Sequence, residues 1–474
     1  MKDEGEGKRV SQGSHQAGRA LSPVAVWAIA LGCVVGWGCF VMPATTFLPA
    51  AGPLGTAIAF VLGTLAVLVV AMSYGYLAKL YPGKPGVYAY THRAFGPNQA
   101  FVCSWCLVLA YSAGMISNTT ALALVLRSVF GEALQFGFHY VIVGYDVFFG
   151  ELLVAFVATV LAALVCIRGV RAIGVVQSVL VVGMVLGACI IGFVAFASPQ
   201  FSFEALSPAF SPDASRLAGV IAVLAVAPFA FIGFEVAFQE SEECRFQPDK
   251  MGLIVVVAIL CGAAMYLLVN TMTAGSVPEG FANWHDYLSA VPGMQGIAAL
   301  PTFNAAYVLA GNVGVTLLGV TALCAVLTGV LGFYLAATRL IYIMAKDGAI
   351  VSSLSREHPA YGTPIAAIVI VLGVGLIVPF LGRTVLGWAV DLMSLGALVA
   401  YSFICATTFK LAKEQGNKPM LVLGIVGVVI GCIMTVVLFV PLPGLGSSLS
   451  RESYIILVAW VALGVNFFTP SQRR

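Results

Sequence analysis

Charged residues are scarce in this sequence. Only 9% of its 474 residues are Asp, Glu, Lys or Arg, whereas a soluble domain carries roughly 25%. Hydrophobic residues make up 60%, which excludes an ordinary soluble protein and leaves no length for a sizeable soluble enzyme domain. The net charge of +3 is small, so nucleic acid is not an expected partner. We therefore expect a membrane protein that is not an enzyme and that is surrounded by lipid.

Signals for cofactors and metal ions are also missing. The eleven cysteines lie almost entirely within apolar runs, where we expect them to act as small packing residues. The Gly-rich segment 82–86 contains Lys84, but it lacks the spacing of a phosphate-binding loop and the Ser or Thr that would follow. ATP-driven transport therefore has no support, and we expect no cofactor and no metal ion.

Twelve apolar runs are long enough to cross a membrane. They cover residues 21–49, 53–80, 98–127, 150–168, 172–197, 216–240, 250–275, 303–345, 363–381, 385–410, 419–440 and 453–469. The first 20 residues are polar and lack the apolar core of a signal peptide, which predicts a disordered cytoplasmic tail. The longest connections, 276–302 and 131–149, are the expected sources of a lid on the outer face.

Basic residues fall mainly on one side of this arrangement. With a cytoplasmic N-terminus, the outer side holds only Arg127, Arg216, Arg383 and Arg451, and the inner side holds the other 19 of the 23 Lys and Arg residues. An excess of Lys and Arg is typical of cytoplasmic loops. The sequence therefore predicts a multi-pass protein of the cell membrane with both termini in the cytoplasm.

Two runs are poorly suited to continuous helix. The first contains Gly32, Gly36 and Gly38, followed by Pro43. The sixth contains Pro228 and Gly233, and Glu235 places a carboxyl near the expected midplane. A membrane helix is interrupted only where its backbone lines a cavity or is buried in protein. Close packing of small residues is the favoured interpretation for Gly32 and Gly36 of the first run, whereas function is favoured for the sixth run, where Pro, Gly and Glu coincide.

The two interruptions lie five runs apart. Because five is odd, a repeat of five runs would return with inverted topology, and interrupted helices in matching positions of two inverted halves mark a transporter binding site. We predict an all-α membrane protein divided into a tail (1–20), a first five-helix repeat (21–200), a second inverted repeat (201–412) and two further helices with a short tail (413–474).

Four motifs occur in consistent order along the chain. They are residues 36–40, residues 229–235 with Glu242 and Glu243 after them, residues 81–90 running into 95–97, and residues 337–348 with 362–364. Together they resemble the amino acid-polyamine-organocation family of secondary transporters. The resemblance implies the leucine-transporter type of fold, with two inverted five-helix repeats and two extra helices.

The resemblance also implies a substrate site at the two interruptions. Half-helix N-termini offer N–H donors to a carboxylate, and half-helix C-termini offer carbonyls to an amine. By position, the carboxylate site would be the N–H groups of Trp37, Gly38 and Cys39, next to Gly36. The amine site would be the carbonyls of Val34, Phe229 and Ile232, next to Gly233. Trp37 and Phe234 are candidates for the pocket wall, and Glu235 is the candidate coupling residue.

The sequence departs from this family in two ways. Trp37 replaces the small residue that is common there, which predicts either a small substrate or an indole that points away from it. The fifth run contains no Lys to stand in for a sodium ion, so the coupling ion stays open. The hypothesis is an amino acid permease, proton-coupled or exchanging, that works by alternating access. The alternatives are transport of a polyamine or other organic amine and, from another class, a channel or receptor-like membrane protein.

Several polar residues have a structural interpretation. Asn118, Gln177, Asn270 and Asn312 are expected to form hydrogen bonds between helices rather than to bind ligands. The cluster of Glu240, Glu242 and Glu243, which lies close to Arg245 and Lys250 in the sequence, is expected to form ion pairs at a gate or loop. Asp391, in the tenth run, has no partner that the sequence identifies.

Overall fold

The computed structural model describes residues 20–82, 86–143, 145–440 and 449–468, with the side chains of Pro228, Phe229 and Pro248 left aside. The expected N-terminal tail, residues 83–85 of the second motif and the C-terminal tail from residue 469 lie outside the described residues. Eight helical segments in the described part are long and apolar enough to cross a membrane. The chain is thus an all-α membrane protein, as the composition predicts.

Each of the twelve apolar runs forms helix in the described residues, and the first and sixth runs are divided. The helices are α2 (Pro23–Val34), α3 (Gly38–Met42), α4 (Leu48–Leu80), α5 (Gly86–Phe95), α6 (Pro97–Phe130), α7 (Phe149–Ile167), α8 (Val170–Ala197), α9 (Arg216–Phe231), α10 (Val236–Gln239), α11 (Met251–Gly275), α12 (Trp284–Ala290), α13 (Pro301–Lys346), α14 (Ile365–Ile377), α15 (Val385–Glu414), α16 (Lys418–Phe439) and α17 (Arg451–Phe467). A π-helical turn, η1 (Pro43–Phe47), follows α3, and a 3-10 helix, η9 (Val378–Thr384), precedes α15.

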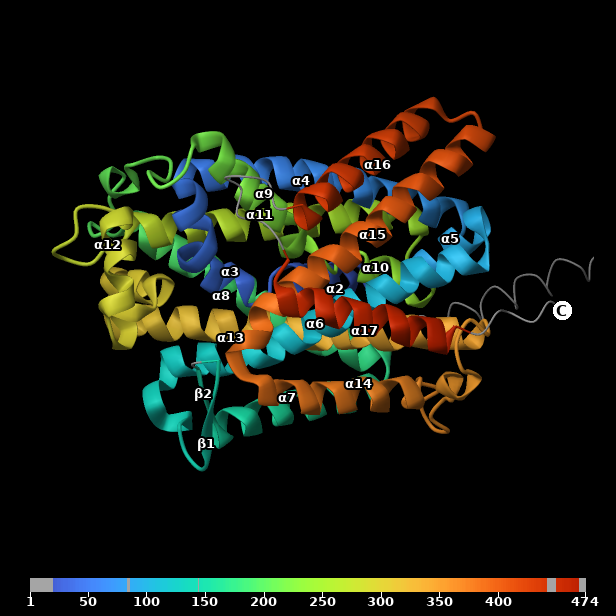
Figure 1. The fold of residues 1–474 in the computed structure, drawn as a ribbon, viewed down its shortest axis with the longest axis horizontal. Helices are drawn as coiled ribbons and strands as arrows, with labels where there is room; N and C mark the ends of the chain where they lie inside the picture. Colours follow the sequence, from blue (N-terminus) through green and yellow to red (C-terminus); the bar gives the residue numbers. More distant parts are fainter. Residues whose placement is uncertain (1–19, 83–85, 144, 441–448, 469–474) are drawn as a thin grey trace, which may run out of the picture.

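The long helices run along one common direction and surround a buried centre (Figure 1). The helix α13 packs against α6 and α8, α15 packs against α6, and α4 packs against α9, while α2 lies against α8 and α11. The two divided helices therefore lie inside the bundle, whereas α16 packs mainly on α15. This arrangement places both interruptions where protein, not lipid, surrounds the backbone.

The two ends of the bundle carry different segments (Figure 1). We call one end the hairpin end, because it carries the antiparallel strands β1 (His139–Ile142) and β2 (Tyr145–Phe148), together with α12 and η9. The opposite end, which carries α5, is called the α5 end. The connection 131–149, which the sequence marks only as a long loop, therefore folds into a small sheet.

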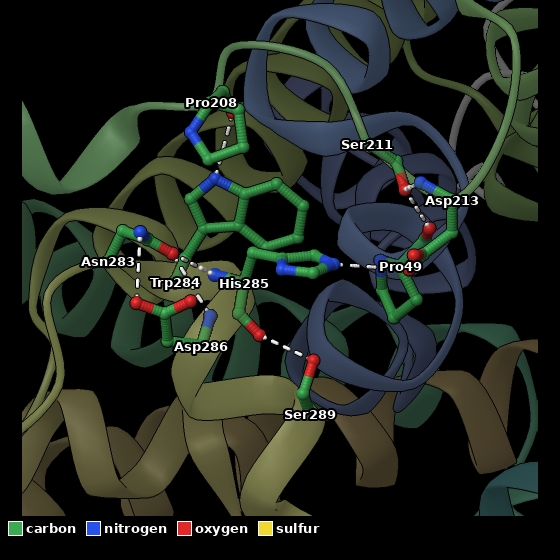
Figure 2. Close-up of polar contacts among 9 residues, drawn as sticks. All are labelled: Pro49, Pro208, Ser211, Asp213, Asn283, Trp284, His285, Asp286 and Ser289. Carbon is green, nitrogen blue, oxygen red and sulfur yellow. Dashed lines mark hydrogen bonds and ion pairs between the residues drawn. The ribbon is translucent and has the colours of Figure 1, made fainter.

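The other long connection, 276–302, is fastened at the hairpin end to the segment between α8 and α9. Asn283 caps α12 by accepting hydrogen bonds from the N–H groups of His285 and Asp286 (both 3.0 Å). Figure 2 shows that the Trp284 indole N–H donates to the Pro208 carbonyl (3.0 Å) and that His285 Nε2 lies 3.2 Å from Oδ2 of Asp213. Both connections expected to form a lid thus fold over this end.

Asp391 has a structural partner that the sequence does not reveal. Its Oδ2 accepts hydrogen bonds from the Ser450 N–H (3.0 Å) and from the Ser453 hydroxyl (2.7 Å). These groups lie at the N-terminus of α17, where a carboxylate is favourable for the helix dipole. Asp391 therefore fixes the start of α17 against α15.

Candidate functional site

The first apolar run is interrupted at residues 35–37. The helix α2 ends at Val34, its C-cap Val35 is extended (φ −100°, ψ 90°), and α3 begins at Gly38. The backbone N–H of Trp37 donates to Oδ1 of Asn118 on α6 (3.3 Å). A Cβ atom on Gly36 would lie 2.8 Å from the same Oδ1, so this close approach requires glycine. The interruption predicted from the glycines is confirmed, and Asn118 forms the interhelical hydrogen bond expected of it.

The sixth apolar run is interrupted at residues 232–235. The helix α9 ends at Phe231, α10 begins at Val236, and Gly233 between them has a φ of 107°. Only glycine adopts such a φ without strain. A Cβ atom at Gly233 would lie 2.3 Å from Cβ of Cys33 in α2. The two interruptions therefore pack directly against each other.

Glu235 lies at the centre of this arrangement and is fully buried. Its Oε2 accepts hydrogen bonds from the Gly233 N–H (3.0 Å) and from the Tyr401 hydroxyl on α15 (2.9 Å). The Tyr111 hydroxyl on α6 faces the same carboxyl and accepts a hydrogen bond from Nε2 of Gln239 (2.8 Å). Glu235 thus links the unwound backbone to two neighbouring helices.

The remaining predicted site residues line the two interruptions. Val34, Gly36, Trp37, Gly38, Cys39, Ile232 and Phe234 are all buried. Phe234 packs its ring against Tyr401 and Tyr74, with centroid separations of 5.6 and 5.9 Å. Phe229 lies within α9, and its side chain is outside the described residues. The structure therefore brings the predicted residues together, although the N–H of Trp37 is already bonded to Asn118 and that of Cys39 to the Gly36 carbonyl (3.3 Å).

Cavities approach the interruptions from opposite ends. At the α5 end, a cavity of about 730 Å³ is lined by Gln239, Arg339 and residues of α5. At the hairpin end, a cavity of about 80 Å³ is lined by Phe40 and Val41 of α3. The buried layer that contains Glu235 and Phe234 separates them.

Ion pairs close the α5 end beside the larger cavity. Arg339 on α13 donates through Nε and Nη2 to both carboxylate oxygens of Glu240 (3.1 and 3.0 Å), and through Nη2 to Glu243 (3.3 Å). Glu240 is fully buried, and such bidentate pairs are the stronger kind. The expected ion pairs near the end of the sixth run therefore form, and their basic partner is Arg339.

The same segment holds the start of the first helix. The Ala20 and Leu21 N–H groups both donate to the Glu243 carbonyl (2.9 Å), and the Arg245 N–H donates to the Leu21 carbonyl (2.9 Å). Glu243 therefore joins its own segment to two others: its carbonyl binds the chain before α2, and its side chain binds Arg339 of α13. The chain before α2 is thus attached to the same segment that carries the ion pairs.

The cavity at the α5 end is also lined by Glu242, Tyr88, His92 and Asp347. Partial burial raises the pKa of Glu242 above that of an ordinary carboxyl, and Arg339 opposes this rise. The Tyr88 hydroxyl donates to Asp347, and both burial and this hydrogen bond raise the Tyr88 pKa. His92 Nε2 lies 3.9 Å from the same Asp347 carboxylate. The cavity is therefore lined by groups of both charges.

Sequence reasoning missed the residues that hold Glu235 and close the α5 end. Tyr111, Tyr401 and Gln239 lie in or next to apolar runs, where a hydroxyl or amide needs a partner. The sequence therefore indicated that each of these groups has a hydrogen-bond partner. Which residue is the partner depends on how the helices are turned toward one another.

Comparisons with known proteins identify the family of the chain. Residues 21–464 match the family model described as "Amino acid permease". The human cationic amino acid transporter 4 is 26% identical over 407 residues, which cover 85% of this chain and 61% of the relative. The branched-chain amino acid permease BcaP of Bacillus subtilis is 25% identical over 426 residues, covering 86% and 84% of the two chains.

A third relative is named for a different substrate. The methylthioribose transporter of Bacillus subtilis is 25% identical over 416 residues, covering 85% of this chain and 83% of the relative. The match to the human transporter spans about three fifths of that protein's length.

Proposed function

The chain belongs to the amino acid permease family, and we propose that it is a secondary transporter that moves amino acids across a membrane by alternating access. The observation that carries this proposal is the meeting of two interrupted helices in a buried layer with a cavity on each side. A channel would instead need a continuous path through that layer.

The binding roles in this proposal follow from the direction of each helix. The N–H group of Gly38, at the start of α3, would hold the substrate carboxylate, whereas those of Trp37 and Cys39 would have to exchange Asn118 and the Gly36 carbonyl for substrate. The carbonyls of Val34, Phe229 and Ile232 would face the amine. Their position at half-helix ends supports these roles.

The coupling role in this proposal belongs to Glu235. Its carboxyl accepts hydrogen bonds from the unwound backbone of the sixth run and from a hydroxyl of α15. A change in its protonation would therefore alter the hydrogen bonds to both elements. A purely structural role remains the competing interpretation, because a buried carboxyl needs partners in any case. Protons are thus the proposed coupling ion, with exchange as the alternative.

Substrate class is tested by counterflow into proteoliposomes. The relatives are named for cationic and branched-chain amino acids and for methylthioribose, so the panel includes labelled leucine, lysine, alanine, putrescine and methylthioribose. We expect counterflow of at least one amino acid. Transport of putrescine alone would favour the organic-amine alternative, and uptake of no compound by folded protein would contradict the proposal.

Topology is part of the same proposal, with twelve crossings, two inverted five-helix repeats, a cell-membrane location and both termini in the cytoplasm. The exposed residues Ser289, next to the hairpin end, and Ser352, after α13, test it. In a cysteine-free background, Ser289→Cys should react with an impermeant maleimide in intact cells and Ser352→Cys should not. The reverse labelling would contradict the proposed orientation.

A further inference from the structure

A separate cavity lies at the hairpin end, between α6, α7, β2 and η9. Its volume is about 260 Å³, slightly below the roughly 300 to 1,000 Å³ of pockets that hold drug-sized ligands. The hairpin is seated over it, because the Tyr140 hydroxyl donates to the Phe380 carbonyl of η9 (2.5 Å). The cavity is thus partly open to the outside, with Asp146 and Arg383 exposed at its rim, and it has room for a small metabolite.

Charged groups of both signs line this cavity. Arg127 forms an ion pair with Glu151, and Glu151 is buried, so these two charges neutralise each other. Arg383 and Asp146 make no ion pair with the described residues, and the Arg383 guanidinium lies 5.4 Å from the centre of the Tyr145 ring. One guanidinium and one carboxylate are therefore left available, and the lining carries no net charge.

A buried hydroxyl adds a second unused polar group. Thr120 on α6 lines the cavity and is 9% exposed, and its hydroxyl has no hydrogen-bond partner among the described residues. A buried polar group without a partner costs free energy unless a ligand or water satisfies it. Apolar side chains of Leu124, Val147 and Leu152 complete the wall.

The cavity also has a connection toward the interruption of the first run. Arg383 and Leu124 line both this cavity and the smaller one that touches Phe40 and Val41 of α3. Arg383 therefore lies between this cavity and the segment that follows the break. A ligand in the cavity lies on the hairpin side of the central site.

We infer that this cavity is a second binding site for a zwitterionic amino acid with an aliphatic side chain. Arg383 binds its carboxylate, Asp146 binds its ammonium group, and Thr120 supplies a hydroxyl, while the apolar wall accepts the side chain. This inference rests on the proposed transport of amino acids. A free anion is disfavoured by Asp146, and a diamine is disfavoured by Arg383, because each would meet a like charge.

The test is the number of leucine molecules bound per chain. Purified protein in lipid nanodiscs is titrated with radiolabelled L-leucine by equilibrium dialysis. We expect two equivalents for the unaltered chain and one for Arg383→Gln and for Thr120→Val. Arg451→Gln is the matched control, because Arg451 is an exposed arginine outside the lining of this cavity, and it should keep two equivalents.

Counterflow of leucine separates this inference from the proposed function. Arg383→Gln should still transport leucine, because the interrupted helices are unchanged. Its half-saturating leucine concentration should rise severalfold, because the second site is lost. A single equivalent bound by the unaltered chain, with normal counterflow, overturns the second site and leaves the proposed function intact. Two equivalents retained by both Thr120→Val and Arg383→Gln also overturn it. Absence of all amino acid transport overturns the proposed function itself.

Melting temperatures guard against a loss of folding. Thr120→Val keeps the shape of the side chain and removes only the hydroxyl, so it should fold even if Arg383→Gln does not. A stably folded Thr120→Val variant that binds one equivalent supports the site on its own.

Discussion

At the α5 end, the segments that follow the second interruption are joined by buried charges, whereas at the hairpin end the covering loops are joined by indole, hydroxyl and exposed ionic contacts. Arg339 holds Glu240, which is fully buried. The corresponding pair at the hairpin end, His285 and Asp213, has an Asp side chain that is 72% exposed (Figure 2). A buried charge therefore joins the segments at the α5 end, whereas at the hairpin end the pair of Arg127 and the buried Glu151 joins α6 to α7 and the loop 276–302 is held by an indole hydrogen bond and an exposed ionic contact.

The difference has a physical consequence for opening. Separating a buried ion pair leaves each charge without a partner unless water reaches it, and the adjoining cavity of about 730 Å³ offers that water. Separating exposed loops changes the surroundings of their charges much less. We expect opening of the α5 end to depend strongly on its charged residues, and opening of the hairpin end to depend on how firmly its loops are attached.

The largest effect is predicted for Arg339→Gln. Removing this guanidinium leaves the Glu240 carboxylate buried and unpaired, which typically costs about 3 to 5 kcal/mol. The melting temperature should fall sharply and counterflow should drop at least tenfold. The double variant Arg339→Gln with Glu240→Gln should recover much of the melting temperature, because the buried carboxylate is then replaced by a neutral amide and only the partly exposed Glu243 loses its partner. A single variant with unaltered stability and transport would mean that the ion pair does not close this end.

The next effect is predicted for Glu235→Gln, in the layer between the two ends. The amide keeps the shape of the carboxyl and most of its hydrogen bonds while it removes the titration. Exchange of substrate should persist, but accumulation driven by a pH gradient, or a preference for cationic substrates, should be lost. Asp391→Asn is the control, since that carboxylate serves α17 and its loss should leave pH dependence unaltered. Unchanged pH-driven accumulation in Glu235→Gln would refute the coupling role.

A smaller effect is predicted for Trp37→Ser. If the indole lines the substrate site, its removal should admit bulkier amino acids and shift the order of substrate preference in the counterflow panel. Trp37→Phe, which keeps an aromatic ring, should shift that order less. An unchanged order in both variants would indicate that Trp37 faces a neighbouring helix.

The smallest effect is predicted for Asp213→Asn at the hairpin end. An exposed ion pair contributes about 0.2 to 1 kcal/mol. The melting temperature should therefore fall by a few degrees at most. A loss as large as that of Arg339→Gln would remove the contrast between the two ends.

The sequence was sufficient for the helices and for the breaks in the first and sixth runs, but it did not indicate the kink at Gly311 inside α13. Long apolar runs predict membrane-spanning helices, because their length matches the thickness of a bilayer. Gly36 and Gly233 mark positions where the structure leaves no room for a Cβ atom. Glu235 was identifiable as a site residue because a carboxyl inside an apolar run is costly.

The residue that each polar side chain contacts on a neighbouring helix could not be predicted in the same way. Which face of α6 meets Trp37, and which basic residue meets Glu240, depends on how each helix is turned about its axis. The sequence accordingly indicated an ion pair near Glu240 without identifying Arg339, and it left Asp391 without a partner. The hairpin 139–148 was missed because short strands in a long connection give only a weak pattern.

Accessibility of the two cavities tests alternating access most directly. Ala89 lines the cavity at the α5 end, and Ala44 lines the small cavity next to α3. Each is replaced by Cys in a cysteine-free background, and maleimide labelling rates are measured in nanodiscs with and without the transported amino acid. The account predicts that substrate changes the two rates in opposite directions. Rates that rise together, or that do not respond to a transported substrate, would contradict it.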